Sequence, residues 1–181
     1  MSPFPRFRTA AARAAGRFRG NQRGSTAVEF ALVAPLFFAL LFAIIETAMV
    51  FFASQVLETV TQDSARMIMT GQAQNSSYTQ AQFKTYVCGK ITVMFDCANG
   101  IYVDVKSYSQ FSTVSVTAPI DSSGNFVNSM SYSPGNAGDI VVVRVFYQWP
   151  LFVTSLGYNI ANLNNKKRLL TATAAFKNEP F

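Results

Sequence analysis

The chain has 181 residues, a formal net charge of +6 and no histidine. Its length fits about one domain, and the lack of histidine excludes Ser-His-Asp and Cys-His catalysis and most transition-metal sites. The two cysteines have no third soft ligand with which to form a zinc site, and no phosphate-binding glycine pattern follows a strand. The acidic residues are scattered singly. We therefore expect neither an enzyme nor a metal or cofactor.

The positive charge lies in the first 24 residues. Six arginines and no acidic residue precede Ser25, whereas the remainder carries nine basic and nine acidic residues. A nucleic-acid-binding domain needs its basic patch on the folded part, so nucleic acid is not an expected partner. We interpret residues 1–24 as a basic leader peptide.

A long apolar segment follows the leader. The run from Phe30 to Ile45 is uncharged, and Glu46 alone interrupts the segment before Ala53. A helix over residues 30–53 would be about 36 Å long, enough to cross a hydrocarbon core of roughly 30 Å. Because all six leader arginines lie on one side of it, we predict a single-pass membrane protein with a cytoplasmic N-terminus and an exported C-terminal part.

Beyond Ala53 the pattern becomes amphipathic, and no helix breaker precedes Gly71. One helix over residues 25–71 is therefore predicted, followed by an exported domain over residues 72–181. The expected fold class is α+β, in which a long membrane-spanning helix continues into a domain with a small antiparallel sheet.

In the predicted exported part, apolar residues occupy every second position after Gly100. Residues 79–94 precede this pattern and fit either a short helix or, near their end, a strand. The first two segments, in which apolar and polar residues alternate, should be half-buried strands joined by a short turn. The third segment is almost wholly apolar and should be a central strand. The strands are predicted at residues 101–106, 113–118, 140–147 and 170–176.

Both cysteines, Cys88 and Cys97, lie in the predicted exported part. In an oxidising compartment a disulfide between them would close a small loop and contribute ~2–3 kcal/mol in the chain-entropy model. Two buried free thiols are the alternative, but the exported location favours the disulfide.

Glu46 has two interpretations. The membrane segment can end near Ile45, which places Glu46 at the membrane surface. Alternatively, Glu46 makes an intramembrane contact between packed helices of neighbouring subunits, because carboxylates inside a membrane seldom lack a partner.

Glu29 stands at the start of the apolar segment, where a charge is costly unless it is paired or the chain is processed nearby. If the chain is cut after Gly24, Glu29 becomes the fifth residue of the mature protein. This arrangement resembles the type IV prepilin signal, and the chain resembles the TadE-like family of minor pilins. Three stretches carry the resemblance: residues 24–35, Glu46 with the later Ala65-Arg66, and the ending Phe176-Lys177-Asn178-Glu179-Pro180-Phe181.

The resemblance implies a pilin-like fold and a minor pilin of a Tad or Flp-type pilus system, contributing to pilus assembly and adhesion. A prepilin peptidase would cut between Gly24 and Ser25, and the mature chain would reside in the bacterial inner membrane with its C-terminal domain in the periplasm. Glu29 would form an ion pair with the N-terminal amine of a neighbouring pilin. The implied partners are the peptidase, other pilins, membrane proteins of pilus assembly and the membrane itself.

An alternative from a different class is an uncleaved, signal-anchored envelope protein whose exported domain binds a partner. The binding element would be the long loop from Asp121 to Gly138, which is rich in Ser, Gly and Asn. Cleavage of the leader distinguishes the two hypotheses.

Overall fold

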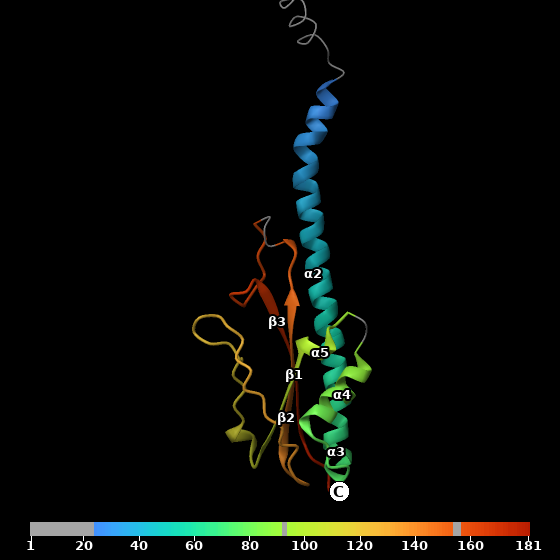
Figure 1. The fold of residues 1–181 in the computed structure, drawn as a ribbon, viewed down its shortest axis with the longest axis vertical. Coiled ribbons are helices and arrows are strands. Elements are labelled where there is room, and N and C mark those ends of the chain that lie inside the picture. The colour runs from blue at the N-terminus through green and yellow to red at the C-terminus, as the bar shows by residue number, and fades with distance from the viewer. Residues whose placement is uncertain (1–23, 92–93, 154–156) are drawn as a thin grey trace, which may run out of the picture. The chain divides into compact units, whose positions relative to one another are not determined.

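The structure is a computed structural model that divides into two compact units, the first ending at Phe42 and the second running from Ala43 to Phe181. Apart from Gly24, the predicted leader lies outside the described residues. The structure describes residues 24–91, 94–153 and 157–181 (Figure 1).

The long helix predicted from the apolar pattern is confirmed as α2 (Ser25–Met69). It continues through Pro35, which removes one backbone hydrogen bond and which membrane helices tolerate better than soluble ones. Gly71 follows the helix with a φ of 75°, a left-handed conformation that favours glycine. Among the described residues, α2 is the one helix long and apolar enough to cross a membrane.

Three strands form one antiparallel sheet in the order β1-β2-β3. Three of the four predicted strands are thereby confirmed, each somewhat longer than its pattern. Their bounds are β1 (Ile101–Tyr108), β2 (Ile140–Pro150) and β3 (Lys167–Lys177).

The strand predicted over residues 113–118 is wrong. A short 3-10 turn, η2 (Phe111–Thr113), is followed by irregular backbone. Both edges of β1 are already occupied, one by β2 and the other by residues 131–133, which exchange hydrogen bonds of 2.8 Å with Val105. Val116 is exposed, so the alternating pattern there does not mark a buried face.

Along the chain, α2 is followed by three short helices before β1 begins. They are α3 (Gln72–Asn75), α4 (Gln80–Lys90) and α5 (Cys97–Gly100). The ambiguous segment begins as a helix because Thr79 and Gln82 form a capping box ahead of α4. Ile91 ends this helix in an extended conformation. The strand considered near the end of the segment involves residues 92–93, which lie outside the described residues.

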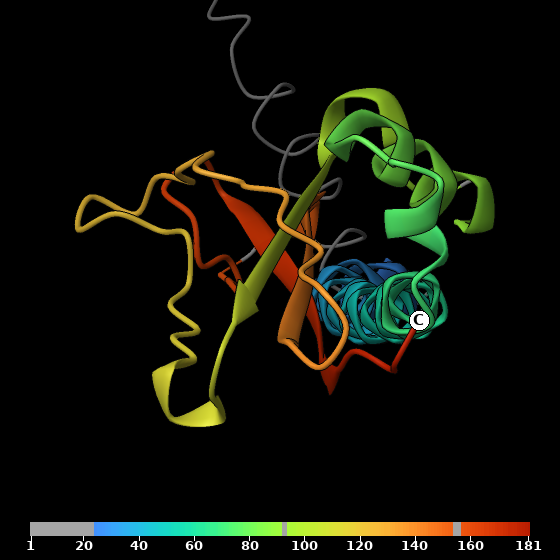
Figure 2. The same ribbon diagram turned by 90° about the horizontal axis from the view of Figure 1, so that it is seen from below.

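The core of the second unit lies between the sheet and the helices. Leu57 and Ile68 of α2 and Phe83 of α4 are fully buried in one cluster with most of the valines of β1 and β2. Phe146 and Leu169 belong to a smaller cluster, against which Phe126 and Met130 pack. The segment that joins β1 to β2 lies on the side of the sheet away from α2 (Figure 2). Strand β2 is therefore covered on both faces, which explains its almost unbroken apolar sequence.

A buried ion pair joins the sheet to that covering segment. The Arg144 guanidinium donates to Asp104 Oδ2 from Nη2 at 2.6 Å and from Nε at 3.2 Å, and its Nη1 donates to the carbonyl oxygen of Thr117 at 2.7 Å. The backbone N–H and hydroxyl of Ser131 donate to Asp104 Oδ1. Two points of the irregular segment are thus held to one charged pair across β1 and β2.

Burial of Asp104 by itself would raise its pKa, but hydrogen bonds from Arg144 and Ser131 outweigh burial and lower the pKa below its ordinary 3.8. A carboxyl with a lowered pKa in the folded state stabilises the fold fully above its ordinary pKa. That contribution is lost as the pH falls through the lower folded value. The stability of the second unit should therefore decline below pH 3.8.

Replacing Asp104 with Asn should lower the free energy of unfolding by about 3 kcal/mol or more, because the buried Arg144 keeps its charge and loses its counter-charge. Denaturant unfolding of the full chain in detergent, followed by circular dichroism, measures the loss. Lys106→Gln is the matched control. Its ammonium lies 3.6 Å from the same carboxylate but is 40% exposed, so the loss should stay below about 1 kcal/mol. Equal losses in the two variants would contradict this account of the buried pair.

Candidate functional site

The predicted processing segment lies where α2 begins. Helix α2 starts at Ser25, directly after Gly24, and both Gly24 and Glu29 are exposed. A Cβ built on Gly24 would meet no heavy atom within 4 Å. The described fold therefore does not require glycine at this position, and any such requirement must come from a molecule that acts on the chain.

The next stretch of α2 exposes large apolar side chains along residues 28–52. Leu32 and Leu36 are each 75% exposed, and Phe51 is still 68% exposed. An apolar helix surface of this length is unfavourable in water, whereas a bilayer solvates it. The helix is compatible with a single-pass membrane anchor.

Glu46 lies within this apolar stretch, yet its side chain is only 6% exposed. Its carboxylate accepts hydrogen bonds from the backbone N–H groups of Phe152 and Val153, the latter at 3.2 Å to Oε1. Two successive backbone N–H groups form a concave site that suits a carboxylate. Glu46 therefore binds the segment after β2.

The following residue of α2 contacts the same region of the chain. The Thr47 hydroxyl donates to the carbonyl oxygen of Ala43 at 2.8 Å and lies 2.9 Å from the Tyr158 hydroxyl. Because the single proton of Thr47 is already donated, Tyr158 must be the donor in the second bond. Glu46 and Thr47 therefore attach the β2–β3 connection to α2 at two points, at Phe152 and Val153 and again at Tyr158.

The predicted disulfide between Cys88 and Cys97 is confirmed, with the two Cα atoms 5.8 Å apart. It joins the last turn of α4 to the first residue of α5. Since α5 leads directly into β1, the bond fixes α4 at the start of the sheet.

The C-terminal residues hold the end of α2. The N–H of Glu179 donates to the carbonyl oxygen of Met69 at 2.9 Å, which satisfies one of the acceptors left open at a helix end. The Asn178 side chain is buried and donates at 3.0 Å to the carbonyl oxygens of Pro134 and Asn136. A Cβ on Gly71 would collide with the Phe181 ring. This ending therefore has a structural role in closing the domain.

The loop considered as a binding element is partly packed on the sheet. The Phe126 ring lies 4.6 Å from that of Tyr102, measured between centroids. Asp121 accepts hydrogen bonds from Asn125 and Ser123, which lower its pKa. In the described part of the chain, no group of three or more His, Cys, Asp or Glu side chains could hold a metal ion.

Residues 24–66 match the model of the TadE-like protein family. This stretch of the chain is similar to TadE-like proteins. The match confirms, over these residues, the resemblance drawn from the sequence. It covers the predicted processing segment, the apolar part of α2 and Glu46, and it ends before the sheet. Comparison with curated proteins and with solved structures gave no match.

The site residues predicted from the sequence thus occupy three places, namely the start of α2, Glu46 and the α4–α5 disulfide. The contact of Glu46 with another subunit stays a prediction, as do the roles of Gly24, Ser25 and Glu29. Sequence reasoning missed the bonds of Glu46 to Phe152 and Val153, which are more than a hundred residues away. An isolated carboxylate in an apolar run was the one signal that such a partner exists.

Replacing Glu46 with Ala should speed amide hydrogen exchange at Phe152 and Val153, because both N–H groups lose their acceptor. Glu46→Gln keeps one acceptor oxygen and should give an intermediate rate. Hydrogen exchange with mass spectrometry on the full chain in detergent measures this effect. Glu58→Ala, on the same helix, should leave these amides unchanged. Identical exchange in Glu46→Ala and wild type would show that the carboxylate does not hold this segment.

Proposed function

We propose that this protein is a minor pilin of a Tad or Flp-type pilus system, made as a precursor and cut between Gly24 and Ser25 by a prepilin peptidase. The observation that carries the proposal is the TadE-like match over residues 24–66. It coincides with a glycine at the start of a long apolar helix whose fifth residue is Glu29. The mature chain anchors in the inner membrane, contacts other pilins and assembly proteins, and contributes to pilus assembly and adhesion.

The geometry around Gly24 supports the processing step. A protease must bring its catalytic groups close to the peptide bond, and a residue without a side chain allows that approach. Gly24 is exposed, with open space where a Cβ would project. The basic residues ahead of it hold the leader in the cytoplasm, since arginines cross a membrane at high cost.

Glu29 supports the assembly step. Cleavage creates a new positive amine at Ser25, and the carboxylate four residues later can pair with the amine of a neighbouring subunit. Such an ion pair is strong near lipid because an unpaired charge there is costly. It would fix the depth at which two pilin helices pack side by side.

The remainder of the chain fits a structural subunit exposed to the periplasm. The Cys88–Cys97 disulfide suits an oxidising compartment, and the chain contains no histidine for acid–base or metal chemistry. We therefore propose a structural role with no catalysis and no cofactor.

Protein extracted from membranes of cells that carry the peptidase should have Ser25 as its N-terminus. Gly24→Val should slow cleavage, because the added side chain blocks close approach to the bond, and a longer precursor should accumulate in the membrane. N-terminal sequencing and gel mobility report both results. Gly89→Ala is a matched control, since a Cβ there also meets nothing within 4 Å. Finding the full leader on wild-type protein in those cells would contradict processing and favour the signal-anchored alternative.

Glu29→Gln should still be cleaved, yet it should crosslink poorly to other pilins. Glutamine keeps the shape and hydrogen bonding of the side chain but lacks the charge that pairs with a neighbour's amine. Gel mobility reports the cut, and crosslinking in membranes reports assembly. Glu58→Gln, which also removes one carboxylate from α2, should assemble normally. Normal crosslinking of Glu29→Gln would refute the ion pair.

A further inference from the structure

We propose that the end of the sheet where β2 stops and β3 starts is a membrane-binding surface that inserts Phe152 into the lipid interface of an anionic membrane. The inference rests on the membrane placement of α2 in the proposed function. It concerns the second unit, where this end of the sheet is attached to Glu46 and Thr47.

The length of the helix determines where the lipid must end. From Phe30 to Phe42, α2 is only about 20 Å long, which is too short for a hydrocarbon core of roughly 30 Å. The bilayer must therefore continue into the second unit, to about Met49. Ile44 and Met49 are 58% and 46% exposed there, so the helix face that the sheet leaves uncovered is suited to lipid.

The β2–β3 connection lies at this same level along α2. Glu46 accepts from the N–H groups of Phe152 and Val153, and Thr47 accepts from the Tyr158 hydroxyl. A segment bonded to residues 46 and 47 cannot lie far from the lipid surface if the hydrocarbon reaches Met49. The helix length thus determines where along α2 the hydrocarbon ends. The hydrogen bonds of Glu46 and Thr47 determine where along α2 the β2–β3 connection lies.

The side chains at this end suit a lipid interface. Phe152 is 80% exposed, the highest value among the exposed large apolar side chains of the described residues. Tyr158 is 38% exposed and directs its hydroxyl to Thr47. Aromatic residues gather at the boundary between hydrocarbon and headgroups, whereas an aromatic ring this exposed to water is unfavourable.

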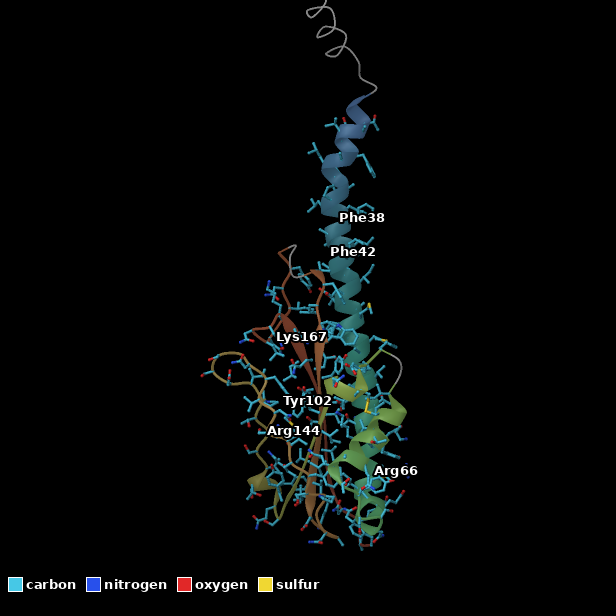
Figure 3. The ribbon with its side chains drawn as sticks, viewed as in Figure 1. Phe38, Phe42, Arg66, Tyr102, Arg144 and Lys167 are labelled. Carbon is cyan, nitrogen blue, oxygen red and sulfur yellow. A yellow bond between two sulfur atoms is a disulfide. The ribbon has the colours of Figure 1, made fainter. Side chains whose placement is uncertain are left out.

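Basic residues complete the surface. In the register of the sheet Lys167 lies opposite Pro150, and Arg168 lies opposite Trp149, so the turn at residues 166–168 sits at the same end (Figure 3). Lys166 and Lys167 are exposed. Two acidic residues lie near this end among the described residues. Glu46 is buried against the N–H groups of Phe152 and Val153, and Asp121 binds Asn125, which in turn contacts Asn164. Three positive charges against two negative charges, one of them on the buried Glu46, leave a positive excess that favours anionic headgroups.

The test uses the full chain reconstituted in vesicles of phosphatidylcholine and phosphatidylglycerol that carry bromine on the upper acyl chain. Phe152→Trp places a fluorophore at the proposed insertion point. Phe111→Trp is the matched control, because Phe111 is 62% exposed and follows β1 at the opposite end of the sheet. The native Trp149 is buried, and its emission is subtracted with wild-type protein.

Emission from position 152 should shift to shorter wavelength and be quenched by brominated lipid, while emission from position 111 should be unaffected. Lys167→Gln introduced with Phe152→Trp should reduce the quenching in anionic vesicles but not in purely zwitterionic ones. Lys177→Gln, at the other end of β3, should not reduce it.

Flotation with the vesicles separates failure of this proposal from failure of the proposed function. If the protein floats but the Phe152→Trp fluorophore is quenched no more than the Phe111→Trp fluorophore, lipid insertion is overturned and the anchor stays intact. A fluorophore at position 152 that is shielded from iodide yet unaffected by brominated lipid also overturns insertion, since a second protein would then cover this end. Protein that does not float overturns the membrane placement itself.

Discussion

The hydrogen bonds that the Glu46 carboxylate accepts from the backbone N–H groups of Phe152 and Val153 determine where the sheet lies along α2. Near Glu46 the surroundings of α2 change. The helix exposes large apolar side chains as far as Phe52, and from Val50 onward its other face contributes Val50, Ala53 and Leu57 to the core. A carboxylate at this boundary would be costly in either an apolar core or lipid. Two backbone N–H groups satisfy it, and they bring the end of β2 against the helix at that level.

The rest of the second unit extends from this attachment. Helix α2 covers one face of the sheet. The disulfide between α4 and α5 holds α4 at the start of β1. The Asp104–Arg144 pair holds the irregular segment between β1 and β2 in place. This segment covers the other face of the sheet. The far end of α2 is closed by Glu179 and Phe181. In the part of the chain that the structure describes, the three-stranded sheet is thereby covered on both faces and attached at both ends of one helix segment.

Features encoded in local pattern could be predicted from the sequence, among them α2, the three strands and the Cys88–Cys97 disulfide. The apolar period acts over short distances in the chain, and the disulfide followed from the short loop between two cysteines that both lie in the predicted exported part. The strand expected at residues 113–118 was wrong because the edge of β1 is taken by residues 131–133, a choice that no local pattern reveals. The partners of Glu46 and the role of Asn178 were also beyond prediction, since both depend on residues brought together by the fold.

The central proposal is that α2 crosses the membrane from about Phe30 to about Met49 and carries the sheet on the exported side. Thiol labelling of Leu36→Cys and Gln62→Cys with a membrane-impermeant maleimide tests this claim directly, because the native cysteines are paired in a disulfide. Both positions are exposed on α2. In intact cells with a permeabilised outer membrane, the cysteine at position 62 should be labelled and the cysteine at position 36 should not. Equal labelling of both, or labelling at position 62 only after the inner membrane is broken, would contradict it.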